Sequence, residues 1–177
     1  MRWTMTWVLY GVVMIFPALA RANTGLCIDL DAQDWLLKNE RIYGAHVKKC
    51  HIDLKERDLI KRVQSGVRGC KRVPVASAFR SLSVAQSVIR STIVQNTRDV
   101  KAWFRRAKKG ETKAFKHKPR QRLAAGLSVS RKSDRYAQRG RACRNKNYVC
   151  ADAKRVTVVL KKANAERCTI LTAYPSE

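Results

Sequence analysis

Val156-Thr157-Val158-Val159-Leu160 and Cys168-Thr169-Ile170-Leu171-Thr172-Ala173-Tyr174 are the two runs of sequence that decide the fold. Both are rich in the β-branched and aromatic residues that strands favour. Between them, Ala163-Asn164-Ala165 has the composition of a turn. Two such runs joined by a short connection predict an antiparallel hairpin at the C-terminal end of the chain.

Upstream of the hairpin, the first apolar pattern has helical spacing. Residues 53–63 predict a helix with Asp53 or a neighbour as its N-cap, and His51 then lies just before it. The apolar face of this helix consists of Leu59, Ile60 and Val63.

Two more helices are expected in the middle of the chain. Ser83 is a suitable N-cap for one of them, and Asn96 or Thr97 begins the other, which ends at Lys108-Lys109-Gly110. Their apolar residues recur every three to four positions, as on the buried face of a helix. These are Ala85, Val88, Ile89, Thr92 and Ile93 in the former and Val100, Trp103, Phe104 and Ala107 in the latter.

Residues 111–144 are polar and basic, which indicates solvated loops and edge strands, with a short strand over 123–129. Helices followed by a C-terminal antiparallel sheet predict an α+β fold. The length is suited to a single domain.

The first 22 residues have the anatomy of a signal peptide. A basic residue is followed by an apolar run over residues 7–20, and small residues then offer cleavage after Ala20 or Ala22, of which we favour Ala22. The alternative is an uncleaved anchor helix, but about 14 apolar residues are fewer than the roughly 20 that span a bilayer. We therefore expect a secreted or periplasmic mature chain of residues 23–177, without stable membrane insertion.

Net charge is the most unusual property of the composition. The chain has 38 basic and 13 acidic side chains, and cleavage removes Arg2 and Arg21 and no acid, so the charge falls from +25 to +23. Such an excess over one domain favours a polyanionic partner such as RNA.

All six cysteines, an even number, fall in the mature part of the chain. Export permits disulfides, whereas zinc ribbons need CxxC pairs, which this sequence lacks. Cys143 with Cys150 and Cys50 with Cys70 are plausible local pairs among fifteen connectivities.

Three histidines, His46, His51 and His117, are the candidates for proton transfer near neutral pH. At the end of the last predicted strand, Thr172 and Tyr174 alternate with Ala173 and therefore share one face of the sheet. Their hydroxyls are suited to holding a phosphate, although both residues are also ordinary strand formers.

Four sequence boxes in order resemble the RNase A-like toxin domain found at the C-terminal tips of bacterial contact-dependent inhibition proteins. Ala45 and Cys50 depart from the family pattern, which has Gly and Arg at these positions. The boxes are Gly44-Ala45-His46 with His51 and Lys61-Arg62-Val63; Ala76-Ser77-Ala78-Phe79 with Trp103-Phe104; Val158-Val159-Leu160; and Leu171-Thr172-Ala173-Tyr174-Pro175.

This resemblance implies an RNase A-like fold and an endoribonuclease that needs no metal or other cofactor. It places the active site at His51, Arg62, Thr172 and Tyr174. His46, Tyr174 or a lysine is a candidate for the second acid or base, with His46 as the accessory candidate. RNA carries the attacking 2′-hydroxyl, which DNA lacks. The resemblance also implies a toxin or effector role and a cognate immunity protein, and we expect a monomer.

Two alternatives remain open from the sequence. The first is a catalytically inactive cationic protein on the same fold that binds RNA or another polyanion. The second is a membrane-active basic protein, which is disfavoured because no segment pairs a broad apolar face with a lysine face.

Overall fold

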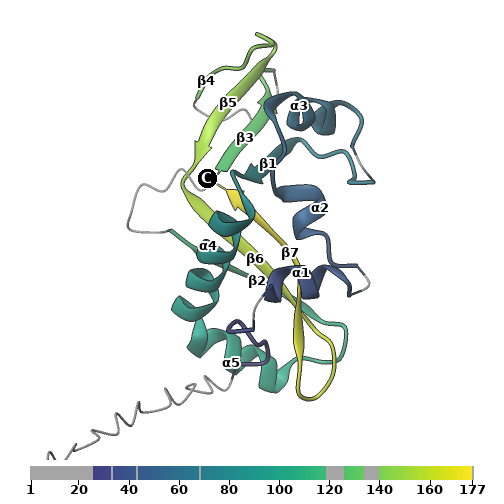
Figure 1. Ribbon diagram of the computed structural model, residues 1–177, viewed down its shortest axis with the longest axis vertical. Helices are drawn as coiled ribbons and strands as arrows, with labels where there is room; N and C mark the ends of the chain where they lie inside the picture. The colour runs from purple at the N-terminus through teal and green to yellow at the C-terminus, as the bar shows by residue number, and fades with distance from the viewer. Residues whose placement is uncertain are drawn as a thin grey trace, which may run out of the picture.

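The computed structural model describes residues 26–176 except 33, 43, 68, 119–125 and 134–139 (Figure 1). The predicted signal peptide, residues 1–22, lies outside the described residues. The helices are α1 (Trp35–Glu40), α2 (Val47–His51), α3 (Glu56–Gln64), α4 (Leu82–Gln95) and α5 (Thr97–Arg106). The strands are β1 (Val75–Phe79), β2 (Thr112–His117), β3 (Gly126–Arg131), β4 (Arg141–Ala142), β5 (Tyr148–Ala153), β6 (Arg155–Lys162) and β7 (Cys168–Ser176).

Two antiparallel sheets organise the described part of the chain. One has the strand order β1-β3-β5-β4 and the other the order β2-β6-β7. Only Lys154 separates β5 from β6, so the chain runs on from one sheet into the other (Figure 1). The predicted C-terminal hairpin is confirmed as β6–β7, and the α+β class is confirmed.

The polar segment 111–144 contains more regular structure than its composition suggests. β3 lies between β1 and β5 and overlaps the strand predicted over 123–129, of which residues 123–125 lie outside the described residues. Ser128 and Ser130 are fully buried there, and the Ser128 hydroxyl donates to the carbonyl of Ala151. Because a hydrogen-bonded hydroxyl can be buried at little cost, this strand needs no apolar pattern.

The first predicted helix is present, but its start is different. α3 begins at Glu56, and the N-cap is Lys55, whose backbone N–H donates to Asp58. Asp53 is therefore not the cap of this helix. It has a left-handed backbone, with φ 55°, in the turn that separates α3 from α2. The first helix thus begins later than predicted, whereas the second begins earlier, with Ser81 as the N-cap that accepts from the Val84 N–H in place of Ser83.

Two apolar clusters lie on either side of the junction between the sheets. The larger one joins α4 and α5 to β2, β6 and β7, with Ile89, Val100 and Leu160 fully buried. In the smaller one, α3 packs on β1 and β3, and Leu59 and Val129 are buried. The segments at the junction of the two sheets therefore pack against one apolar cluster on each side.

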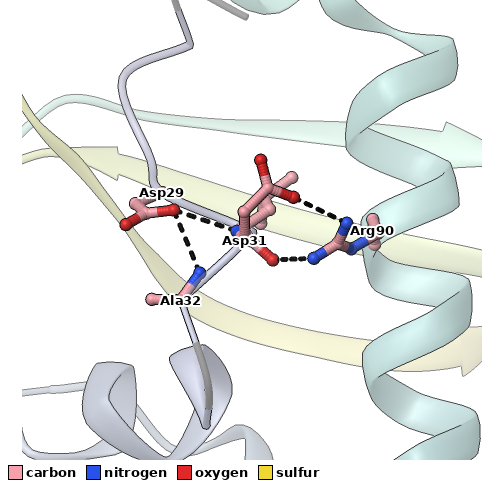
Figure 2. A network of polar contacts seen from close by, with 5 residues as sticks. Asp29, Asp31, Ala32 and Arg90 are labelled. Atoms are coloured by element: carbon pink, nitrogen blue, oxygen red, sulfur yellow. Dashed lines mark hydrogen bonds and ion pairs between the residues drawn. The ribbon is translucent and has the colours of Figure 1, made fainter. Parts of the chain in front are cut away.

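The N-terminal lead is fastened to α4 by Arg90 (Figure 2). The Arg90 guanidinium donates to the Asp31 carboxylate at 2.7 Å and to the Leu30 carbonyl. Asp29 accepts from the backbone N–H groups of Asp31 and Ala32 at 2.9 and 3.2 Å. These contacts hold the segment that precedes α1. The helix α1 in turn lies at the outer edge of β7.

Three disulfides use all six cysteines: Cys27–Cys168, Cys50–Cys70 and Cys143–Cys150. The two local pairs agree with those favoured from the sequence. The third ties the N-terminal lead to the start of β7. Within the described ranges, no helix has the length and apolar composition to cross a membrane.

Candidate active site

His51 lies at the last position of α2, and its imidazole is buried, with 6% of the residue exposed. Its Nδ1 is 2.9 Å from the carbonyl oxygen of Ser77 in β1. A carbonyl only accepts, so Nδ1 carries the proton. The neutral ring is thereby fixed in the tautomer that leaves a lone pair on Nε2, where it can accept a proton from a substrate.

Arg62 reaches His51 from α3. Its Nη1 donates to the carbonyl of Cys50 at 2.5 Å and lies 3.5 Å from His51 Nδ1. Because His51 Nδ1 already donates its N–H to the Ser77 carbonyl, it cannot accept a hydrogen bond from Arg62. The 3.5 Å contact between Nδ1 and Nη1 is therefore electrostatic. The turn after α2 folds the chain back, so that residues eleven positions apart meet as the resemblance implies.

Arg62 is a buried charge without an acidic partner among the described residues. Only 6% of it is exposed, and the described ion pairs, Arg80–Asp152 and Arg90–Asp31, do not include it. Burial lowers the pKa of the guanidinium. An arginine side chain nevertheless keeps its positive charge in proteins. Burying a charge unpaired is costly, so this position is suited to an incoming anion.

The same surroundings keep His51 neutral. Its pKa is lowered from 6.5 to about 3, mainly by burial and in addition by the positive charge of Arg62 and by His46. The hydrogen bond to Ser77 acts in the opposite direction. At neutral pH His51 is therefore a proton acceptor and not a proton donor.

This pKa has a consequence for stability. Between pH 6.5 and about 3 the unfolded chain is protonated at His51 and the folded chain is not, so folding becomes less favourable as the pH falls. In this window His51 is expected to make the free energy of unfolding fall by about 1 kcal/mol per pH unit. Denaturant unfolding of wild type and His51→Asn measures this, and equal slopes in the two proteins would contradict it.

A β-bulge directs Thr172 and Tyr174 to the site. Val159 pairs with Thr172 but Leu160 pairs with Ile170, so Leu171 is the extra residue. Before the bulge Ile170 faces the core, and after it Ala173 does. Without the extra residue, strict alternation would place Thr172 and Tyr174 on the core face.

Asn39 of α1 and His46, which directly precedes α2, hold this bulge along the outer edge of β7. Buried Asn39 accepts from the Ile170 N–H at 2.8 Å and donates to the Ile170 carbonyl at 2.6 Å, as a neighbouring strand would. The N–H of His46 donates to the carbonyl of Leu171 at 3.2 Å. The edge of the sheet and the position of the two hydroxyl residues are fixed by the same contacts.

Two buried polar atoms in the described residues have no hydrogen-bond partner: Nε of Arg62 and Oγ1 of Thr172. Both belong to the predicted site. Tyr174 completes it, with its ring centroid 5.4 Å from that of His51. Since buried polar groups are normally paired, two unpaired ones in one predicted site indicate that a polar ligand belongs there.

Of the other two histidines, His46 lies beside His51 and His117 does not. His46 precedes α2, its ring centroid is 6.2 Å from that of His51, and its Nδ1 lies 2.9 Å from the Gly44 carbonyl. His117 is in β2, which β6 separates from β7, so it is not part of this cluster. The four predicted residues and His46 thus gather at the junction of the two sheets.

Among the described residues, one group of potential metal ligands and one groove lie outside this cluster. Glu56, Cys143 and Cys150 have potential ligand atoms within 4.8 Å of one another, but the two cysteines form a disulfide and have no thiolate to offer. A groove of about 1090 Å³ runs along α3 from Asp53 to Arg144. It begins two residues after His51.

Sequence reasoning did not identify Asn39 or Ser77 as contributors to the site. Asn39 lies 131 residues from its partner Ile170, and Ser77 lies 26 residues from His51. Ser77 is within one of the boxes that carry the family resemblance, which is the one signal that could have singled it out. Nothing local marks Asn39.

Comparisons with known proteins identify the fold and the family of the chain. No curated protein matches the chain. A crystal structure of a CdiA-CT/CdiI complex from Y. kristensenii 33638 has a similar fold, with a TM-score of 0.53 and 21% identity, covering 72% of this chain and 95% of that one. The family described as "Bacterial CdiA-CT RNAse A domain" matches residues 45–175, which include all four predicted site residues. The chain belongs to this bacterial CdiA-CT RNAse A domain family.

Proposed function

We propose that this protein is an exported endoribonuclease that cleaves RNA by transphosphorylation from the 2′-hydroxyl. One observation carries the proposal: a buried, uncompensated guanidinium at Arg62 lies beside a neutral imidazole at His51. A cation that binds a phosphodiester and a base that takes a proton are the two groups this reaction needs. The family's RNase A description is in line with them.

In the proposed reaction, Nε2 of His51 takes the proton of the 2′-hydroxyl. The 2′-oxygen forms a bond to phosphorus, and the bond from phosphorus to the 5′-oxygen breaks as that oxygen gains a proton. The products are a 2′,3′-cyclic phosphate and a free 5′-hydroxyl. The RNA supplies its own nucleophile, so no metal-activated water is needed.

The unpaired atoms have roles in binding the phosphate. Nε of Arg62 and the hydroxyl of Thr172 donate to its non-bridging oxygens, and Tyr174 donates from the other side of His51. The bound anion also offsets the charge of Arg62. That raises the pKa of His51 from its low value in the free protein, which makes the imidazole a stronger base when substrate is present.

A second group has to protonate the leaving 5′-oxygen, and His46 is the candidate. It is half-buried next to His51. Substrates with a sulfur at the 5′ leaving position need no acid, so His46→Ala should cleave them as fast as wild type while losing activity on ordinary RNA. An equal loss on both substrates would exclude this role.

Export and an inhibitor partner are part of the proposal. Three disulfides are suited to an oxidising compartment, as the sequence of residues 1–22 is to export. The structural neighbour was solved with CdiI, and we propose that an inhibitor protein similarly binds this chain, itself a monomer. Sedimentation of the purified protein tests the monomer, and loss of RNA cleavage on adding a candidate inhibitor tests the partner.

The deciding experiment incubates the oxidised protein with labelled RNA in EDTA. We expect cleavage that leaves cyclic or 3′-phosphate ends and that is lost in His51→Ala. The alternative is a cationic binder without catalysis, which the charge of +25 would also support. Intact RNA that is retained in a salt-dependent manner would favour the binder.

A further inference from the structure

Ser77 contacts both halves of the site through two different atoms. Its carbonyl accepts from Nδ1 of His51 at 2.9 Å, and its hydroxyl donates to the carbonyl of Pro175 at 2.7 Å. Only 5% of the residue is exposed. Pro175 follows Tyr174 directly in β7, so one serine contacts the imidazole on one side and the end of the hydroxyl-bearing strand on the other.

The hydroxyl bond crosses between two separate sheets. Ser77 lies in β1 of the four-stranded sheet and Pro175 in β7 of the three-stranded one, and no ladder of backbone hydrogen bonds joins these two strands. The placement of Tyr174 against His51 therefore rests on the backbone bond from the His46 N–H to the Leu171 carbonyl and on side-chain contacts at this junction, such as that of the Ser77 hydroxyl.

A glycine allows the two sheets to approach at this point. Gly126, at the start of β3, lies against Pro175: a Cβ built on it would be 2.6 Å from Pro175 Cγ and 2.0 Å from the Ala78 carbonyl oxygen. Real Cβ atoms do not lie this close to other atoms, so a side chain at position 126 would force the neighbouring atoms to shift. The junction is thus close-packed around Pro175, and the Ser77 hydroxyl fixes the strand end within it.

We infer that Ser77 is a positioning residue for the proposed ribonuclease, whose hydroxyl sets the placement of Tyr174 against the imidazole that its own carbonyl orients. The inference rests on the proposed function. It assigns to Ser77 no contact with the substrate; Ser77 acts through Pro175 and Tyr174.

A matched control lies directly opposite on the neighbouring strand. Ser128 pairs with Ser77 across β1 and β3, is fully buried, and donates its hydroxyl to the Ala151 carbonyl at 3.2 Å within the same sheet. Ser77→Ala and Ser128→Ala each remove one buried hydroxyl from adjacent places. Ser77→Ala removes the bond to Pro175 that crosses between the sheets, whereas Ser128→Ala removes the bond to Ala151 within one sheet.

Steady-state cleavage of RNA separates the two variants. Displacing a catalytic group by about 1 Å can cost roughly 10²-fold in rate, so kcat of Ser77→Ala should fall by roughly 10- to 100-fold while KM stays within about twofold. Ser128→Ala should keep its kcat within about twofold of wild type, with a comparable decrease in the thermal unfolding midpoint. Equal kcat values for the two variants would overturn the inference.

A second readout needs no activity. The charged groups that face His51 are Arg62 and His46, and burial keeps the ring neutral in acid. At pH 4.5 the ring nitrogens, followed by NMR, should be those of a neutral imidazole in wild type and Ser128→Ala. In Ser77→Ala the loosened junction admits water, and the ring should be protonated; an unchanged neutral ring there would overturn the inference. A wild-type protein that leaves RNA intact would overturn the proposed function instead.

If Ser77→Ala does not fold, Ser77→Thr and Ser77→Val replace it. These side chains have the same shape, both suit a strand, and they differ in the hydroxyl. The threonine variant should exceed the valine variant in kcat by roughly tenfold or more. Equal activities would show that the hydroxyl does not position the site.

Discussion

Arg62→Met is expected to lose RNA cleavage without losing stability. The guanidinium is the buried cation that binds the phosphate in the proposed reaction, and removing one such preorganised donor costs roughly 10²–10³ in kcat. In the free protein the same charge is buried without an acidic partner among the described residues. Burying a charge without a partner of opposite sign is costly, so its replacement by an apolar side chain of similar length is expected to leave the free energy of unfolding unchanged or higher.

The measurement pairs kcat/KM on labelled RNA with denaturant unfolding. Arg80→Met is the matched control, because Arg80 is an exposed arginine whose partner, Asp152, lies 3.4 Å away. It should change kcat/KM by less than about threefold, since exposed ion pairs contribute little. An Arg62→Met protein that unfolds more easily than wild type and cleaves RNA normally would show that Arg62 is structural.

Loss of the Cys50–Cys70 disulfide should reduce activity more than loss of either other bridge. Cys50 directly precedes His51, and its carbonyl accepts the hydrogen bond of Arg62. Without the bridge, that carbonyl and the imidazole after it can move relative to α3. We expect Cys50→Ser/Cys70→Ser to lose roughly 10²-fold in kcat, as displaced catalytic groups do.

Stability should follow a different order, because the entropy that a bridge removes from the unfolded chain grows with the length of the loop. The separations are 141 residues for Cys27–Cys168, 20 for Cys50–Cys70 and 7 for Cys143–Cys150. The losses in unfolding free energy should be about 5, 3 and 2 kcal/mol, respectively. Thermal unfolding and kcat of the three double-serine variants check this, and activity losses that simply follow the stability losses would contradict a special role for Cys50–Cys70.

The elements with local sequence patterns were predictable. The β-branched runs fix β6 and β7, and the apolar faces of α4 and α5 follow a helical period. β3 was expected as a short strand in a solvated segment and not as a buried strand between two others, because Ser128 and Ser130 stand at its buried positions. The Ser128 hydroxyl donates there to the Ala151 carbonyl. The order of apolar and polar residues along the sequence does not reveal that such a strand is buried.

The family resemblance named the residues of the candidate site, whereas the residues that hold them in place could not be predicted. Thr172 and Tyr174 share one face of the strand by simple alternation. Which face they share depends on the bulge at Leu171, and no glycine or other turn residue in the sequence indicates that bulge. The same applies to Asn39 and Ser77, whose hydrogen bonds join residues 131 and 98 positions apart. Contacts of this kind arise from the tertiary fold and leave no local periodicity.

The proposed chemistry is tested most directly with a DNA oligonucleotide that contains one ribonucleotide, incubated with the protein in EDTA. The 2′-hydroxyl of that nucleotide is the single internal nucleophile available. We expect one cut, on its 3′ side, leaving a 2′,3′-cyclic phosphate, and no cut in the all-DNA oligonucleotide or with His51→Ala protein. Cleavage of the all-DNA strand, or an uncut oligonucleotide with wild-type protein, would contradict the assignment.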